Sequence, residues 1–198
     1  MTRHLCSLAA VVIVSVLAVL TCWAGDEMVA NPYYKFWSKS KPGATAVHHE
    51  ITKLSGPEGK LLPGGEDEKR ITYKLVEFDD KRAIVQMVVT ERDFLGYVQA
   101  APTRYIYPAQ LKKSQLERIL LADGGKPGEG SVMVGGKEMK TKTMSGTIKE
   151  PGGEEVDFKV WFTPEVPGAI VKQVRTTRQK GDLVAETTIT LQSYKHAD

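Results

Sequence analysis

Apolar and polar side chains alternate along much of the chain, most clearly between residues 156 and 162. Every second position there carries an apolar side chain: Val156, Phe158, Val160 and Phe162. A period of two places these four on one face of a β-strand and the intervening Trp161 on the other. The stretch 163–168 contains two prolines and a glycine, which end a strand and permit a sharp turn, and 169–174 resumes the extended pattern. We therefore predict two antiparallel strands joined by a proline–glycine corner, from which the other strands pair outward.

Further alternating segments lie on both sides of this pair. We expect strands at residues 45–54, 69–78, 82–92, 97–107, 132–134, 137–149 and 183–194. Turn sequences such as Asp79-Asp80-Lys81 and Gly135-Gly136 leave no room for a crossover helix, so the strands should be antiparallel. About eight such strands predict a mainly β protein, with an antiparallel curved sheet or half-open barrel, or a sandwich, and one or two short helices.

Two segments favour short helices. In the first, Asn31-Pro32 precedes the aromatic run 33–37, and proline suits the first position of a helix. We interpret this run as a helical turn whose aromatic side chains cover an open end of the sheet, with a segment at a membrane interface as the alternative. The second is 109–121, whose apolar positions fit helical spacing in part, with a strand over 118–122 as the alternative.

Two glycine-rich segments are expected to be loops. Residues 55–68 are predicted to form a long connection, and residues 123–131 a flexible turn. The second segment has glycines like those of a phosphate-binding loop, but it lacks the lysine followed by serine or threonine that holds phosphate and magnesium. We therefore predict no phosphate-binding loop and no cofactor.

The amino terminus has the features of an export signal. Arg3 precedes an apolar run over residues 5–20, and mostly small residues follow up to Ala24, a suitable cleavage site. The alternatives are an uncleaved membrane anchor and a lipoprotein acylated at Cys22. The predicted organisation is a signal peptide at 1–24, an N-terminal arm with the aromatic segment at 25–44, and an antiparallel β domain at 45–198. We expect the protein to be periplasmic or secreted.

Charge and cysteine content narrow the range of functions. The chain has 27 Lys and Arg against 24 Asp and Glu, a net charge of +3, with both signs interleaved. This balance argues against nucleic acid as a partner. Both cysteines, Cys6 and Cys22, lie in the first 22 residues, so the body of the chain has no disulfide framework, cysteine nucleophile or cysteine metal ligand.

His48 and Glu50 are the candidate polar pair. They lie two positions apart on a predicted strand and so share a face, as a general acid–base pair requires. His49 points to the other face and His196 lies in the tail, so no metal site is predicted. Because no nucleophile motif accompanies the pair, we interpret it as part of a solvated strand face and expect the protein not to be an enzyme.

The sequence KVWFTPEVPGAIVKQV at 159–174, followed by TTITLQSY at 187–194, resembles exported bacterial sheet proteins of the periplasmic lipoprotein-carrier and sorting group. In that group a tryptophan-containing strand often precedes a proline–glycine corner. The chain also resembles uncharacterised exported proteins of planctomycete-type bacteria, which have an Asn-Pro-aromatic-Trp segment like that at 31–37. The resemblance implies a half-open barrel with a helix across its mouth and an acyl chain as guest.

We therefore expect an exported, non-enzymatic β domain that binds an apolar ligand, a lipid or a lipoprotein on a concave sheet face. The candidate apolar surface consists of Phe158, Val160 and Phe162, with Trp161. The alternatives are a structural or envelope-associated interaction module whose core is filled from within, and an enzyme of unknown type. The expected partner is a lipid or another envelope protein.

Overall fold

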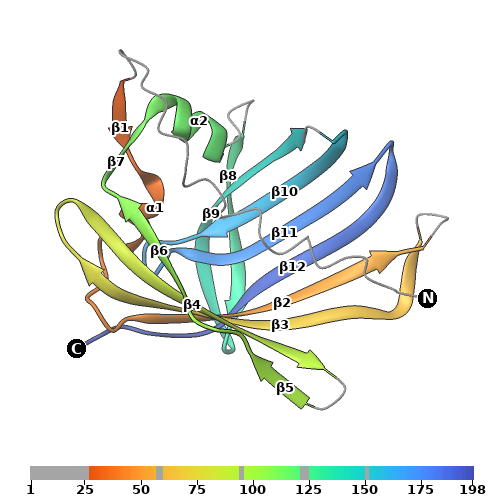
Figure 1. Cartoon of the computed structure of the whole chain (residues 1–198), viewed down its shortest axis with the longest axis horizontal. Helices are drawn as coiled ribbons and strands as arrows, with labels where there is room; N and C mark the ends of the chain where they lie inside the picture. Colours follow the sequence, from red (N-terminus) through yellow and green to blue (C-terminus); the bar gives the residue numbers. More distant parts are fainter. Residues whose placement is uncertain (1–26, 57–59, 94–95, 121–124, 150–151) are drawn as a thin grey trace.

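Strands make up most of the molecule (Figure 1). The computed structural model describes residues 27–56, 60–93, 96–120, 125–149 and 152–198, so the predicted signal at 1–24 and Cys22 lie outside the described residues. The described elements, in chain order, are β1 (Met28–Ala30), α1 (Pro32–Trp37), β2 (Thr45–Ser55), β3 (Leu61–Phe78), β4 (Arg82–Asp93), β5 (Gly96–Gln99), β6 (Thr103–Pro108), β7 (Gln110–Lys112), α2 (Lys113–Leu120), β8 (Lys126–Val134), β9 (Lys137–Lys149), β10 (Glu154–Phe162), β11 (Ile170–Gln179) and β12 (Asp182–Lys195). A mainly β chain with two short helices confirms the predicted fold class.

Ten of the strands form one antiparallel sheet, in the order β5-β4-β3-β2-β12-β11-β10-β9-β8, with β6 also paired to β4. Consecutive strands pair as predicted, and β2 pairs with β12, which joins the two ends of the domain. The strands outnumber the expected eight partly because the segment around Pro102 separates β5 from β6, and both lie along β4. Strands β1 and β7 form a separate two-stranded sheet beside α2.

The sheet is strongly curved around α1. Tyr33 stacks on Tyr107 of β6, with ring centroids 5.8 Å apart, and Phe36 lies 6.1 Å from Phe162 of β10. In a flat sheet these two strands would be about 29 Å apart, at about 4.8 Å per strand. A helix of six residues is about 9 Å long and reaches both only if the sheet curls around it. The face that α1 covers, called the α1 face below, is therefore the concave one.

The aromatic segment forms the predicted plug at one end of this face. Asn31 is the N-cap of α1, and its side chain accepts a hydrogen bond from the backbone N–H of Tyr33. Trp37 is 5% exposed and packs with Leu75 and Val85. The alternation in β3 and β4 directs these aliphatic side chains to the plug, so the α1 end of the core is filled from within.

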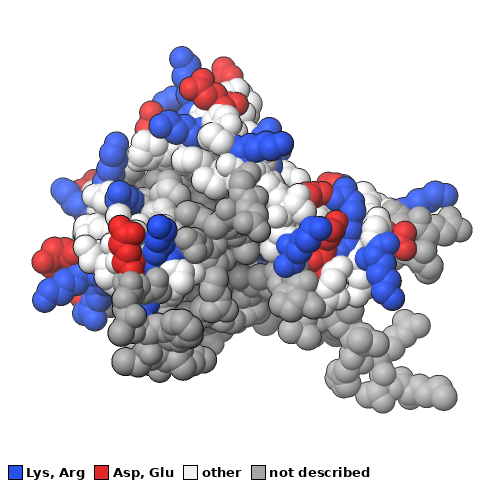
Figure 2. All heavy atoms as spheres, turned by 90° about the horizontal axis from the view of Figure 1, so that it is seen from above, with Lys and Arg blue, Asp and Glu red and all other residues white. Residues whose placement is uncertain are grey.

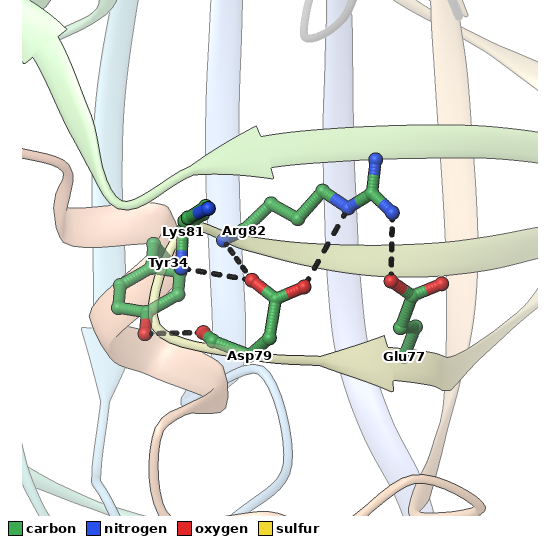
Figure 3. Close-up of polar contacts among 5 residues, drawn as sticks. All are labelled: Tyr34, Glu77, Asp79, Lys81 and Arg82. Carbon is green, nitrogen blue, oxygen red and sulfur yellow. Dashed lines mark hydrogen bonds and ion pairs between the residues drawn. The ribbon is translucent and has the colours of Figure 1, made fainter.

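The turn between β3 and β4 is fastened to α1 through Asp79 (Figure 3). Its Oδ1 accepts hydrogen bonds from the backbone N–H groups of Lys81 and Arg82, at 2.8 and 2.9 Å, and these bonds hold the pKa of Asp79 below its usual range. Its backbone carbonyl accepts a 2.7 Å hydrogen bond from the Tyr34 hydroxyl. Arg82 also pairs with Glu77. The predicted Asp79-Asp80-Lys81 turn is confirmed, and it anchors the plug.

The proline–glycine corner between β10 and β11 packs on the plug from the other side. Gly168 has φ +74°, and a Cβ there would lie 2.9 Å from the Trp37 ring. Only glycine meets both requirements, because other residues are strained at positive φ and bring a Cβ into that contact. The corner also buries Val166, 1% exposed, against Val171 and Leu191.

The expectation of a flexible turn at 123–131 is wrong from residue 126 onward, while 121–124 lie outside the described residues. Residues 126–134 are strand β8, paired with β9. The glycines serve packing rather than a loop: a Cβ on Gly128 would lie 2.7 Å from Thr143 Oγ1, and one on Gly130 would lie 3.2 Å from Trp161 Nε1. The predicted hairpin at Gly135-Gly136 is confirmed, with φ of +55° and +81°.

Two other boundaries differ from expectation. Residues 61–68, assigned to a long connection, are the first part of strand β3, because pairing with β2 continues from Lys69 back to Leu61. The helix expected over 109–121 begins only at Lys113, because 110–112 pair with β1. The alternative strand over 118–122 is wrong for 118–120, which are helical.

Candidate functional site

The α1 face carries the predicted apolar positions of β10 beyond the plug. Strand register places Phe158 opposite Arg175 and Val160 opposite Gln173, and paired residues share a face. The Phe158 ring lies against Gly146 of β9, where a Cβ would approach it to 3.1 Å. Phe158, Val160 and Phe162 are each partly buried. These three predicted residues do share one face of the strand.

Trp161, the fourth predicted apolar position, lies on the opposite face. It is paired with Thr143 on β9 and Lys172 on β11. The ammonium groups of Lys159 and Lys172 lie 4.9 and 5.4 Å from the centroid of its ring. Trp161 therefore belongs to a separate surface, called the Trp161 face below, and does not line the concave face.

A row of charged side chains crosses the α1 face. The strand register places three charged residues side by side, Glu50 on β2, Lys69 on β3 and Glu91 on β4, with Ile189 of β12 beside Glu50. Lys69 Nζ lies 3.2 Å from Asp67 and 3.1 Å from Glu91. Burial lowers the pKa of Lys69, but the contacts with Glu91 and Asp67 together outweigh it and raise the pKa above its usual range. The middle of the concave face is thus amphipathic, with apolar positions on β10 and charged ones on β2, β3 and β4.

Glu50 is buried, with 5% exposure, and faces Arg175 at 3.8 Å. Burial raises the pKa of Glu50, while Arg175 and Lys69 oppose that rise. The Nε of Arg175 is buried and has no hydrogen-bond partner among the described residues. At 3.8 Å, Glu50 and Arg175 form an ion pair but no hydrogen bond. The guanidinium of Arg175 therefore has at least one N–H donor, at Nε, without an acceptor.

His48 lies two residues along the same face and is 4% exposed. Its Nε2 is 2.9 Å from the carbonyl oxygen of Ile170, which makes this nitrogen the donor and leaves Nδ1 unprotonated in the neutral ring. Nδ1 is buried and unpartnered among the described residues. Burial lowers the pKa of His48, and the hydrogen bond to Ile170 opposes that effect. The ring meets Tyr73 edge to face, with centroids 5.6 Å apart.

The interpretation of His48 and Glu50 as a solvated strand face is therefore wrong. Sequence reasoning placed both on one face, as observed, but missed the curvature that buries them. Arg175 and Lys69 were missed as their neighbours because alternation does not reveal which strands are adjacent. Within the described residues no group of three or more His, Cys, Asp and Glu side chains is placed to hold a metal ion.

Charges of both signs are mixed on the outer surface. Figure 2 shows Lys and Arg groups beside Asp and Glu groups on the face that it presents. Ion pairs at the surface include Lys53 with Glu66 at 3.2 Å and Arg82 with Glu77 at 2.8 Å. In the part of the chain that the structure describes, no helix has the length and apolarity needed to cross a membrane.

No protein-family model matches the chain, and the search of curated proteins finds no match. Solved structures with some similarity include the MucA/MucB complex of Pseudomonas aeruginosa (12% identity, TM-score 0.41, 84% of this chain and 56% of that chain). Another is MucB alone (11% identity, TM-score 0.39, 83% and 57%). A third is a DUF1329 family protein from Desulfovibrio piger (8% identity, TM-score 0.25, 83% and 92%). This chain spans little more than half the length of the first two, and scores this low assign it neither a family nor a function.

Proposed function

We propose that this protein is an exported, non-enzymatic binding domain that holds an apolar chain, such as the acyl chain of a lipid, against the α1 face. The curved sheet supplies the cradle, and α1 closes one end of it. Export rests on the sequence at 1–24, which has the charged start, apolar run and small-residue ending of a signal peptide.

The observation that carries the proposal is the extent of apolar surface on β10 beyond the plug. The ring contact of α1 on this strand is made with Phe162. Phe158 lies four residues further along, about 13 Å at about 3.3 Å per residue, whereas α1 is about 9 Å long. Val156, Phe158 and Val160 are only partly buried there. Covering such side chains with an acyl chain is favourable by about 25 cal/mol per Å² of apolar area.

The charged row restricts how a guest lies. An acyl chain placed over Glu50 and Arg175 would remove this loosely paired ion pair further from water and offer no partner to the buried Nε of Arg175, which is costly. We therefore place the apolar chain along β9 and β10, with the polar end of the guest toward β11 and β2. The resemblance to the lipoprotein-carrier group implies the same kind of guest, an acyl chain.

The lipids bound to natively purified protein test this proposal. Mass spectrometry of an organic extract is expected to recover a lipid in stoichiometric amount from the wild type and much less from Phe158→Glu. The control Trp161→Phe changes an aromatic residue of the same strand on the opposite face and should retain the lipid. A wild-type protein free of lipid that also takes up none from mixed vesicles would exclude the proposal.

A second candidate is an interaction module that binds another protein. It is favoured by the edge strand β5, where Tyr97 is 71% and Val98 is 55% exposed. An open sheet edge with exposed apolar side chains suits the addition of a strand from a partner. A lipid-free protein whose Tyr97→Lys variant loses a protein partner captured by the wild type would support this function instead.

A further inference from the structure

The Trp161 face contains a second surface with features of a binding site. Trp161, Lys172 and Thr190 lie in one lateral row across β10, β11 and β12. The ammonium groups of Lys172 and Lys159 both lie over the indole, at 5.4 and 4.9 Å from its centroid. The attraction of each ammonium to the aromatic ring holds two positive charges beside one flat side chain.

A hollow of about 320 Å³ lies between this row and strand β8. Gly130 allows β8 to come close to the indole, since a Cβ at that position would lie 3.2 Å from Trp161 Nε1. The residues that line the hollow combine an aromatic ring, a lysine, two hydroxyl residues and two aliphatic residues: Ser131, Val132, Met133, Trp161, Lys172 and Thr190. The walls therefore offer flat apolar surface, hydroxyl groups and positive charge together.

The two lysines of this site have no carboxylate in direct contact among the described residues. Neither Lys159 nor Lys172 forms an ion pair with a carboxylate of a described residue, whereas nine other contacts between a described Lys or Arg and a described Asp or Glu are ion pairs. The residues that line the hollow include no Asp or Glu. An anion placed here gains from the ammonium group of Lys172, which lines the hollow, and lies near that of Lys159 on the same indole, without displacing a carboxylate.

We propose that this hollow binds an anionic sugar, meaning a pyranose that carries a carboxylate or a phosphate. The anionic group pairs with Lys172 and Lys159, and the pyranose ring lies against Trp161. The sugar hydroxyls form hydrogen bonds with Ser131 and Thr190. Amphipathic rings such as indole combine an apolar face with a polar N–H, which suits a ligand that is both ring-shaped and hydroxylated. This site lies on the opposite face of the sheet from the proposed lipid-binding surface, so the two proposals can be tested independently.

Tryptophan fluorescence tests the proposal with the full chain. Glucuronate and glucose 6-phosphate are titrated at millimolar concentrations, with glucose and inorganic phosphate as the neutral and ring-free probes. Subtracting the signal of Trp161→Phe isolates Trp161, because the other tryptophans, Trp23 and the buried Trp37, are common to both proteins. We expect saturable changes with the two anionic sugars and much weaker ones with the other two probes.

Two lysine variants test whether the positive charge of Lys172 contributes to binding of the anionic sugar. Lys172→Met keeps the aliphatic stem and should weaken binding at least about tenfold, as expected for the loss of one charge-assisted contact. The control variant Lys195→Met, which replaces an exposed lysine at the end of β12, should leave the binding affinity unchanged. Unaltered circular dichroism verifies that the variants fold. Equal affinity in Lys172→Met and the wild type, an equal response to inorganic phosphate alone, or no response to either anionic sugar would overturn the proposal.

Discussion

His48 is a buried histidine that folding keeps neutral. Its Nε2–H is engaged with Ile170, and its lowered pKa means that the unfolded state, with a pKa of about 6.5, binds a proton more readily. Stability from this residue is therefore fully present above pH 6.5, and it is lost as the pH falls below about 6.5. Glu50 acts in the opposite sense, because its raised pKa favours the folded state at low pH and that contribution is lost as the pH rises.

The His48→Asn variant separates the two effects. The free energy of unfolding is measured by urea titration between pH 5 and pH 8 in the wild type and the variant. The wild type should lose more stability toward pH 5 than His48→Asn does, since Glu50 is common to both. Parallel pH profiles would show that His48 does not titrate differently in the folded and unfolded states.

Gly168 is a residue at which the addition of a single methyl group should lower the stability of the folded protein. Gly168→Ala adds positive-φ strain of about 1–2 kcal/mol and a contact with Trp37 that must be relieved by movement. Gly152→Ala is the matched control, because a Cβ there meets nothing within 4 Å and the residue lacks a positive φ. Thermal unfolding should show a lower midpoint for Gly168→Ala only; equal midpoints would contradict the packing described for the corner.

Among the elements, α1 holds the two sides of the curved sheet together. Trp37→Ala removes a ring that is 5% exposed and should cost about 3–5 kcal/mol in the free energy of unfolding. Tyr97→Ala, which removes a ring that is 71% exposed on β5, should change it little. Chemical denaturation of the two variants makes the comparison, and a small loss in Trp37→Ala would show that the sheet curves without the plug.

The same elements show what alternation reveals about this fold. The strands from 45 to 54 and from 156 to 162, the helix after Asn31 and the Gly135-Gly136 turn follow from local patterns, and the structure confirms them. The start of β3 and the first part of β8, residues 126–131, were missed because glycine and proline normally mark loops. In β8 the missing Cβ atoms instead make room for Thr143 and Trp161, a requirement that arises only from long-range packing.

For the whole molecule, the pairing of β2 with β12 decides the candidate sites. It brings Glu50 beside Ile189 and within reach of Arg175, residues more than a hundred positions apart in the sequence. Periodicity assigned Phe158, Val160 and Phe162 to one face and Trp161 to the other, but it left open which face is concave. That answer comes from α1, whose contacts on β6 and β10 require the sheet to curl toward it.

Binding of a fluorescent palmitate analogue to the delipidated protein tests the lipid cradle most directly. The wild type and Trp161→Phe should bind the probe saturably with the same affinity, and Phe158→Glu should bind it at least about tenfold more weakly, because a carboxylate beside an acyl chain is poorly solvated. Equal affinity in all three proteins, or no binding by the wild type, would contradict the assignment of the α1 face as the binding surface.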